Sequence, residues 1–108
     1  MVPWNGKTHG IIYTNNVEVG RQKLLEIEKE NNDKGIKTEI KRFSGIENVI
    51  GFENGDMWRI IRPNDSSRGY RWNKAYVDAS DTTISMLYNF ILPSGLGARL
   101  DDITYFNW

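Results

Sequence analysis

The sequence contains no cysteine, has a single histidine, His9, and carries no net charge. Without cysteine, disulfide bonds and thiolate metal sites are excluded. No acid or nucleophile that would make His9 a catalytic base is suggested beside it, so we assign no catalytic residues. The 14 basic side chains are balanced by 14 acidic ones, whereas a general polyanion binder carries an excess of positive charge. Any contact with nucleic acid is therefore expected to be local.

Long apolar runs are also absent. No stretch approaches the roughly 20 residues of a membrane span, and no signal-like apolar region follows Met1. We therefore expect a soluble, cytoplasmic protein without a membrane partner. At 108 residues, with 39% apolar and 26% charged side chains, the chain is predicted to fold as one domain, residues 1–108.

Local patterns predict an alternation of strands and helices. Asn15, with Glu18 three residues later, resembles a capping box for the first helix, and Gly35 suits a left-handed exit from it. Asn54-Gly55 is the strongest two-residue hairpin signal. Ser80 or Asp81 can cap the second helix. The expected strands are 11–14, 36–41, 46–53, 56–62, 75–77 and a final edge strand within 100–108, and the expected helices are 16–31 and one that follows residue 81 and stops at Pro93 and Gly95.

These elements predict a single α/β domain with a mixed sheet of five to six strands and two helices. The order strand, helix, strand at the start implies one right-handed βαβ unit with a parallel pair. The second helix carries an apolar stripe of Ile84, Leu87, Tyr88 and Ile91. One hairpin completes the fold.

Cations and rings alternate between Trp58 and Tyr76, where Asp65 is the only acid. Guanidinium groups suit phosphate oxygens, and flat rings accept stacked bases. An alternative stays open, in which outward cations simply alternate with inward rings and Arg68 pairs with Asp65. The candidate partner-binding residues are Arg59, Arg62, Arg68, Gly69, Tyr70, Arg71, Trp72 and Lys74.

The segments 52–55, 58–61, 68–71 and 75–78 (Phe-Glu-Asn-Gly, Trp-Arg-Ile-Ile, Arg-Gly-Tyr-Arg and Ala-Tyr-Val-Asp) resemble the middle of terminase-type and helicase-type P-loop ATPases. In that family a hairpin leads to an Arg-Gly loop and then to the Walker B strand, whose terminal carboxylate holds Mg²⁺. The resemblance covers about residues 10–92, with 11–16 similar to the preceding strand-to-helix step. It implies that Asp78 is a metal ligand.

Two departures from that family bear on catalysis. Ala79 follows Asp78, where the family has a glutamate that activates water. Gly6-Lys7-Thr8 matches only the end of the phosphate-loop motif, because Met1 stands where its first glycine belongs and no strand precedes it. We therefore expect no ATP hydrolysis by this chain alone.

The sequence favours a small non-catalytic binding protein of a phage or mobile element, in the cytoplasm of its host cell and without a cofactor. Its Arg-aromatic loop would contact a protein or nucleic acid, and inhibition of a host or defence enzyme is one role known by analogy. Two alternatives stay open: a fragment or subunit of a P-loop ATPase that binds nucleotide and Mg²⁺ through Asp78, and a structural subunit of a viral assembly. The rings Tyr105, Phe106 and Trp108 allow homo-oligomerisation through the C-terminal segment.

Overall fold

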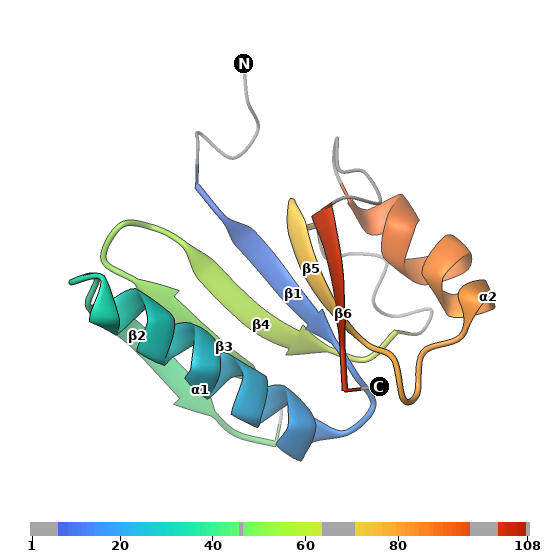
Figure 1. Cartoon of the computed structure of the whole chain (residues 1–108), viewed down its shortest axis with the longest axis horizontal. Helices are drawn as coiled ribbons and strands as arrows, with labels where there is room; N and C mark the ends of the chain where they lie inside the picture. The colour runs from blue at the N-terminus through green and yellow to red at the C-terminus, as the bar shows by residue number, and fades with distance from the viewer. Residues whose placement is uncertain (1–6, 46, 64–70, 96–101, 108) are drawn as a thin grey trace.

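One mixed sheet of six strands organises the protein, in the order β2-β3-β4-β1-β5-β6. The computed structural model describes residues 7–45, 47–63, 71–95 and 102–107. The predicted α/β class, with a mixed sheet and two helices, is confirmed (Figure 1). The elements are β1 (His9–Tyr13), α1 (Val17–Asp33), β2 (Thr38–Phe43), β3 (Asn48–Phe52), β4 (Met57–Ile61), β5 (Lys74–Asp78), α2 (Ile84–Met86) with its extensions η2 (Leu87–Ile91) and η3 (Leu92–Ser94), and β6 (Ile103–Phe106).

Strand directions divide the sheet into two parts. β1 pairs in parallel with β4 on one side and β5 on the other, and β6 extends this part as the parallel neighbour of β5. β2, β3 and β4 pair as an antiparallel meander. β2 therefore runs parallel to β1, as the crossover through α1 requires, but two strands lie between them. The two strands of the predicted βαβ unit are thus parallel but do not hydrogen-bond to each other, because β3 and β4 turn back and fill the place beside β1.

The two faces of the sheet carry separate apolar clusters, since successive side chains of a strand point to opposite faces. α1 covers one face and the α2 segment packs on the other (Figure 1). The α1 face buries Ile12, Leu24, Ile27, Ile50, Phe52 and Trp58. The opposite face buries Ile11, Tyr13, Trp72, Ala75, Val77, Leu87, Ile91 and Ile103.

The cap of α1 is Asn16, one residue later than predicted. Its side chain accepts hydrogen bonds from the backbone N–H groups of Glu18 and Val19 at 3.1 and 3.4 Å. Beyond the C-terminus of α1, Gly35 has φ = 84°, and in the β3–β4 turn Gly55 has φ = 93°. Both glycines thus adopt the left-handed conformation that the sequence predicts at these two turns.

The second helix begins later than predicted and changes its winding. Thr83 caps it, with its side chain accepting from Met86 N–H at 3.2 Å, so the prediction of Ser80 or Asp81 as the cap is wrong. The helix widens to a π turn over η2 and ends in the 3₁₀ turn η3. Pro93 accounts for the widening, because a proline ring clashes with the carbonyl four residues before it and supplies no N–H.

The two edge strands differ in protection. β2 carries alternating charges and a register irregularity between Thr38 and Ile40, both of which discourage further pairing. β6 is the predicted final edge strand, and Tyr105 on it is 38% exposed. In the part of the chain that the structure describes, no helix is long and apolar enough to cross a membrane.

Candidate functional site

The carboxyl ends of β1, β5 and β6 meet at one edge of the sheet because these strands are parallel. We call this the carboxyl edge. Thr14 follows β1, Asp78 ends β5 and Asn107 follows β6. After β1 the chain enters α1 on one face, and after β5 it enters α2 on the other. The position between β1 and β5 is therefore a topological switch point, where open α/β sheets bind ligands.

Asp78 is the centre of this edge and has no solvent exposure. Its carboxylate accepts hydrogen bonds from the hydroxyls of Thr14 (2.6 Å) and Ser80 (2.7 Å), from the Ser80 backbone N–H (3.0 Å) and from the Asn107 amide (3.1 Å). Burial by itself would raise the pKa of Asp78, but these donors outweigh it and lower the pKa below its ordinary value. The carboxylate is thus a charged acceptor at neutral pH.

Further polar groups surround this carboxylate. Asp81 accepts from the backbone N–H of Asn15 at 3.0 Å and lies 3.4 Å from the Thr14 hydroxyl. Asn107 has φ = 58°, a left-handed conformation that asparagine tolerates better than most residues, and its amide also reaches the Ser80 hydroxyl at 3.2 Å. Sequence reasoning missed Thr14, Ser80 and Asn107. Their only signal is a polar residue placed at or just after the end of a strand.

The donor chemistry at this edge fits Mg²⁺, which takes oxygen ligands and is usually held by one or two carboxylates plus substrate phosphates. Asp78 and Asp81 supply the carboxylates, and Thr14 and Ser80 supply hydroxyls. Among the described residues, no group of three or more His, Cys, Asp or Glu side chains is placed to hold a metal ion. The edge therefore offers part of a coordination shell, and phosphate oxygens would have to supply the rest.

The Lys7-Thr8 pair lies at the opposite edge, which we call the amino edge. Thr8 precedes β1, and its backbone N–H donates to Asp56 at 2.8 Å. A phosphate loop must follow the carboxyl end of a strand. This position agrees with the interpretation that the Gly-Lys-Thr run is not a phosphate loop; Gly6 itself lies outside the described residues.

The predicted cationic residues do not form one surface in the described part of the chain. Arg59 is half-buried within β4, with its guanidinium 3.2 Å from the sulfur of Met57. Arg62 follows β4 at the carboxyl edge, whereas Lys74 begins β5 at the amino edge, in register with Gly10. Four residues of strand, about 13 Å, separate the two levels. Arg68, Gly69 and Tyr70 lie outside the described residues.

Trp72 is a core residue rather than a contact residue. It has no solvent exposure, and its indole N–H donates to the carbonyl of Ile91 at 2.9 Å. The prediction that its ring faces a partner is therefore wrong. The cause is that burial of so large a ring outweighs the polar character of its neighbours.

Arg71 and Lys74, by contrast, are exposed at the amino edge. Arg71 borders an open hollow of about 440 Å³, whose other lining residues are Tyr88, Asn89, Pro93 and Ser94. Tyr88 belongs to the predicted apolar stripe of the second helix, but its ring is 58% exposed, and Ile84 on the same stripe is 75% exposed. The hollow therefore combines a cation and a ring, as the Arg-aromatic hypothesis requires, with a ring that the hypothesis had not included.

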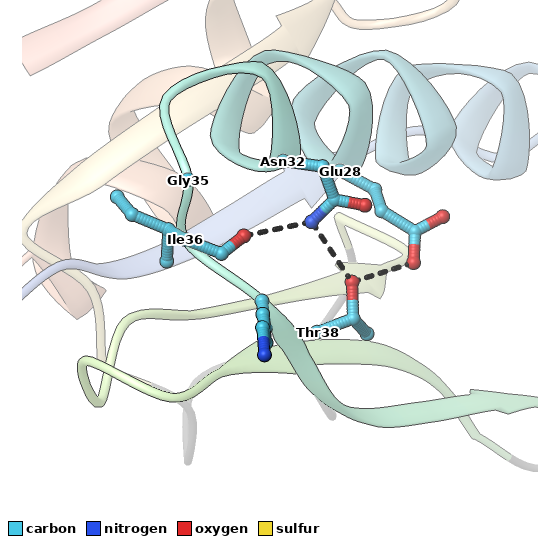
Figure 2. Close-up of a pocket in the computed structure, with 6 residues that line it drawn as sticks. Glu28, Asn32, Gly35, Ile36 and Thr38 are labelled. Carbon is cyan, nitrogen blue, oxygen red and sulfur yellow. Dashed lines mark hydrogen bonds between the residues drawn. The ribbon is translucent and has the colours of Figure 1, made fainter.

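A second hollow, of about 400 Å³, lies between the end of α1 and the start of β2 (Figure 2). Asn32 donates to the Ile36 carbonyl at 2.8 Å, and the Thr38 hydroxyl donates to Glu28 at 2.8 Å. Burial would raise the pKa of Glu28, but hydrogen bonds from Lys41 and Thr38 lower it. These polar groups are used within the connection between α1 and β2, so we assign the hollow a structural role.

No family model, no curated protein and no solved structure matches the chain. The resemblance to P-loop ATPases consequently rests on the short motifs and on the position of Asp78 at the end of a parallel strand.

Proposed function

We propose that this chain is a non-catalytic fragment or subunit of a terminase- or helicase-type P-loop ATPase core, and that it binds a nucleotide with Mg²⁺ at the carboxyl edge. The supporting observation is the charged carboxylate of Asp78 at the end of β5, 2.6 Å from the hydroxyl of Thr14 at the end of β1. The resemblance to the Walker B strand assigns a Mg²⁺-binding carboxylate to this position. Switch points of this kind are the usual ligand sites of open α/β sheets.

The residues of the edge have distinct roles in this proposal. Asp78 would hold the ion, and the hydroxyl oxygens of Thr14 and Ser80 would be further ligands if their protons turned away from Asp78. Access to the buried carboxylate would require the Asn107 amide to release its bond to Asp78. Bound Mg²⁺ would supply the positive charge that neutralises phosphate oxygens. No glutamate follows Asp78, and Lys7 and Thr8 lie at the other edge, so another chain would supply the phosphate loop and the site would bind without hydrolysis.

Calorimetric titration of the chain with ATP tests this proposal. We expect heat of binding with Mg²⁺, none with EDTA, and loss of binding in Asp78→Asn and Ser80→Ala. Asp33→Asn is the matched control, because Asp33 is an exposed acid at the far end of α1, paired with Lys29 at 3.3 Å. Binding that needs no Mg²⁺, or that survives in both edge variants while their far-ultraviolet spectra stay native, contradicts the proposal.

A second candidate function is favoured by the amino edge. Arg71 and Lys74 are exposed there, and Tyr88 lines the same hollow as Arg71, which supports a non-catalytic module that binds a protein or nucleic-acid partner. Inhibition of a host or defence enzyme is one form that this function can take. Affinity capture from the host with wild-type protein and with Arg71→Ala/Lys74→Ala tests it. A partner captured equally by both forms would count against this surface.

The exposed edge of β6 favours self-association as an additional property. Tyr105 is 38% exposed on this edge strand, and strand addition is a common mode of pairing. Light scattering after size exclusion is the test. A monomer mass that stays constant over a hundredfold range of concentration would exclude it.

A further inference from the structure

We propose that the hollow between Arg71 and Tyr88 holds one nucleotide unit of single-stranded nucleic acid, with the base stacked on the Tyr88 ring and the phosphate on the Arg71 guanidinium. The inference rests on the second candidate function above and names its partner. It is independent of nucleotide binding at Asp78, which belongs to the other edge of the sheet.

The exposure of Tyr88 follows from the winding of η2. Leu87 and Ile91 of this π turn are buried, with exposures of 7% and 0%. They direct Tyr88, between them, away from the core, and its ring is 58% exposed. π turns inside helices frequently coincide with functional sites, and an exposed ring is a platform on which any base can stack.

The position of Arg71 is set by its neighbour Trp72. The Trp72 backbone N–H donates to the Ser94 carbonyl at 3.3 Å, and its indole N–H donates to the Ile91 carbonyl at 2.9 Å. These bonds tie Trp72, the residue after Arg71, to η3 and to the end of η2, the turn that carries Tyr88. The segments that carry the cation and the ring are therefore joined through the core, although both side chains are exposed.

The walls and floor of the hollow are polar. Asn89 carries an amide that can donate and accept, and it is steadied by a bond of 3.0 Å to the Ser85 hydroxyl. Ser94 is buried, and its hydroxyl donates to the Phe90 carbonyl at 3.0 Å. Beneath it lies the buried hydroxyl of Tyr13, which meets no partner with hydrogen-bond geometry in the described chain, although Ser94, Trp72 and the charge of Arg71 influence its pKa.

Size and charge select the class of ligand. The volume of about 440 Å³ lies at the lower end of the range of small-ligand sites, which suits one nucleotide rather than a folded surface. Lys74 stands three residues after Arg71, and extension of the β5–β6 register places one acid, Asp102, beside it. Among the described residues that line the hollow, Arg71 is the charged one, although the whole chain is neutral. A base can lie on Tyr88 only if it is unstacked, which favours single strands over duplexes.

Fluorescence anisotropy with labelled oligothymidylate and oligouridylate of about ten nucleotides, a length within the usual site sizes, tests the inference. Tyr88→Ala should weaken binding roughly 5- to 150-fold, the range expected for loss of one stacked base, whereas Tyr88→Phe should bind like wild type. Arg71→Gln should weaken binding and reduce the slope of log affinity against log salt by about 0.7, as for one lost phosphate contact on a single strand. Arg42→Gln removes an exposed cation from the β2 edge, paired with Glu47 at 3.6 Å, and should change neither.

Each contrary result identifies what fails. Equal losses of affinity in Tyr88→Ala and Tyr88→Phe would overturn the assignment of Tyr88 as the stacking ring. A loss of affinity in Arg71→Gln alone would overturn the nucleotide site, because it would show only a nonspecific attraction between one cation and phosphate. If oligonucleotides bind all three hollow variants as tightly as they bind wild type, the hollow is not the binding site. The second candidate function, a module that binds nucleic acid, would then still hold. Absence of oligonucleotide binding, with a protein partner captured through Arg71, would overturn the nucleic-acid assignment alone.

Discussion

The two edges of the parallel sheet use their polar residues in opposite ways. At the carboxyl edge the polar side chains bond to one another, and Asp78 accepts four hydrogen bonds without reaching solvent. At the amino edge Arg71 and Lys74 are exposed, next to Trp72, which is entirely buried. Changes at the carboxyl edge should therefore alter stability and any ligand binding together. At the amino edge the two effects should separate.

The largest loss of stability is expected at Trp72, the buried residue of the amino edge. Trp72→Ala should lower the free energy of unfolding by about 3–5 kcal/mol, because it leaves a cavity in the core and removes the donor to the Ile91 carbonyl. Urea unfolding followed by circular dichroism measures this. Tyr88→Ala, which changes an exposed ring of the hollow, should stay within about 0.5 kcal/mol of wild type. Similar losses in both variants would mean that the exposed ring is structural.

The next largest change in the free energy of unfolding is expected at Asp78, where two replacements should differ. Asp78→Ala leaves the hydroxyls of Thr14 and Ser80 and the Ser80 N–H without their acceptor, and should cost about 3 kcal/mol. Asp78→Asn should cost about 1 kcal/mol, because one oxygen remains for Ser80 and the Thr14 hydroxyl can turn to accept from the new amide. The same unfolding assay compares them. Equal losses would show that charge, rather than hydrogen bonding, holds the edge together.

The pH dependence of stability sharpens the contrast further. The pKa of Asp78 is lower in the folded protein than in the unfolded chain, so the ionised carboxylate stabilises the fold above the unfolded pKa of about 4. This contribution is lost as the pH falls through 4 and then through the folded pKa. Thermal unfolding between pH 7 and pH 3 should therefore show a steeper acid loss for wild type than for Asp78→Asn. Arg71→Gln should parallel wild type.

The smallest change in stability is expected at the buried hydroxyl of Tyr13, beneath the amino-edge hollow. Tyr13→Phe removes a buried hydroxyl that has no well-formed hydrogen bond in the described chain, so stability should stay level or rise by up to about 1 kcal/mol. Burial raises the pKa of this hydroxyl far above its ordinary value, so it stays neutral at any ordinary pH. A loss above about 1 kcal/mol would show that Ser94 or Trp72 bonds to it in solution.

Local sequence signals predicted the elements well, because each depends on neighbouring residues. Asn54-Gly55 forms the expected turn with Gly55 at positive φ, and Gly35 likewise follows α1. The order of strands was not predictable in this way. Whether β2 or β4 lies beside β1 depends on pairing between distant segments, and no residue within 36–41 carries that information.

The candidate site was predictable only in part for the same reason. Asp78 was found because it ends a short apolar strand, but its partner Thr14 is 64 positions away in the chain. Trp72 was misplaced because its neighbours are polar, while its burial is decided by Ile91 and the opposite turn. The exposure of Tyr88 was not predictable from the apolar stripe, because the stripe assumes α-helical winding, which the π turn changes.

The central place of β1 has a consequence for the order of folding. β1 pairs with β4 on one side and with β5 on the other, so one of its edges finds a partner only after residue 61 has been synthesised, and the other only after residue 77. Pairing across such long separations is entropically costly and slow. During translation the described chain is therefore expected to remain largely unfolded until β5 emerges, and then to complete the sheet in one late, cooperative step.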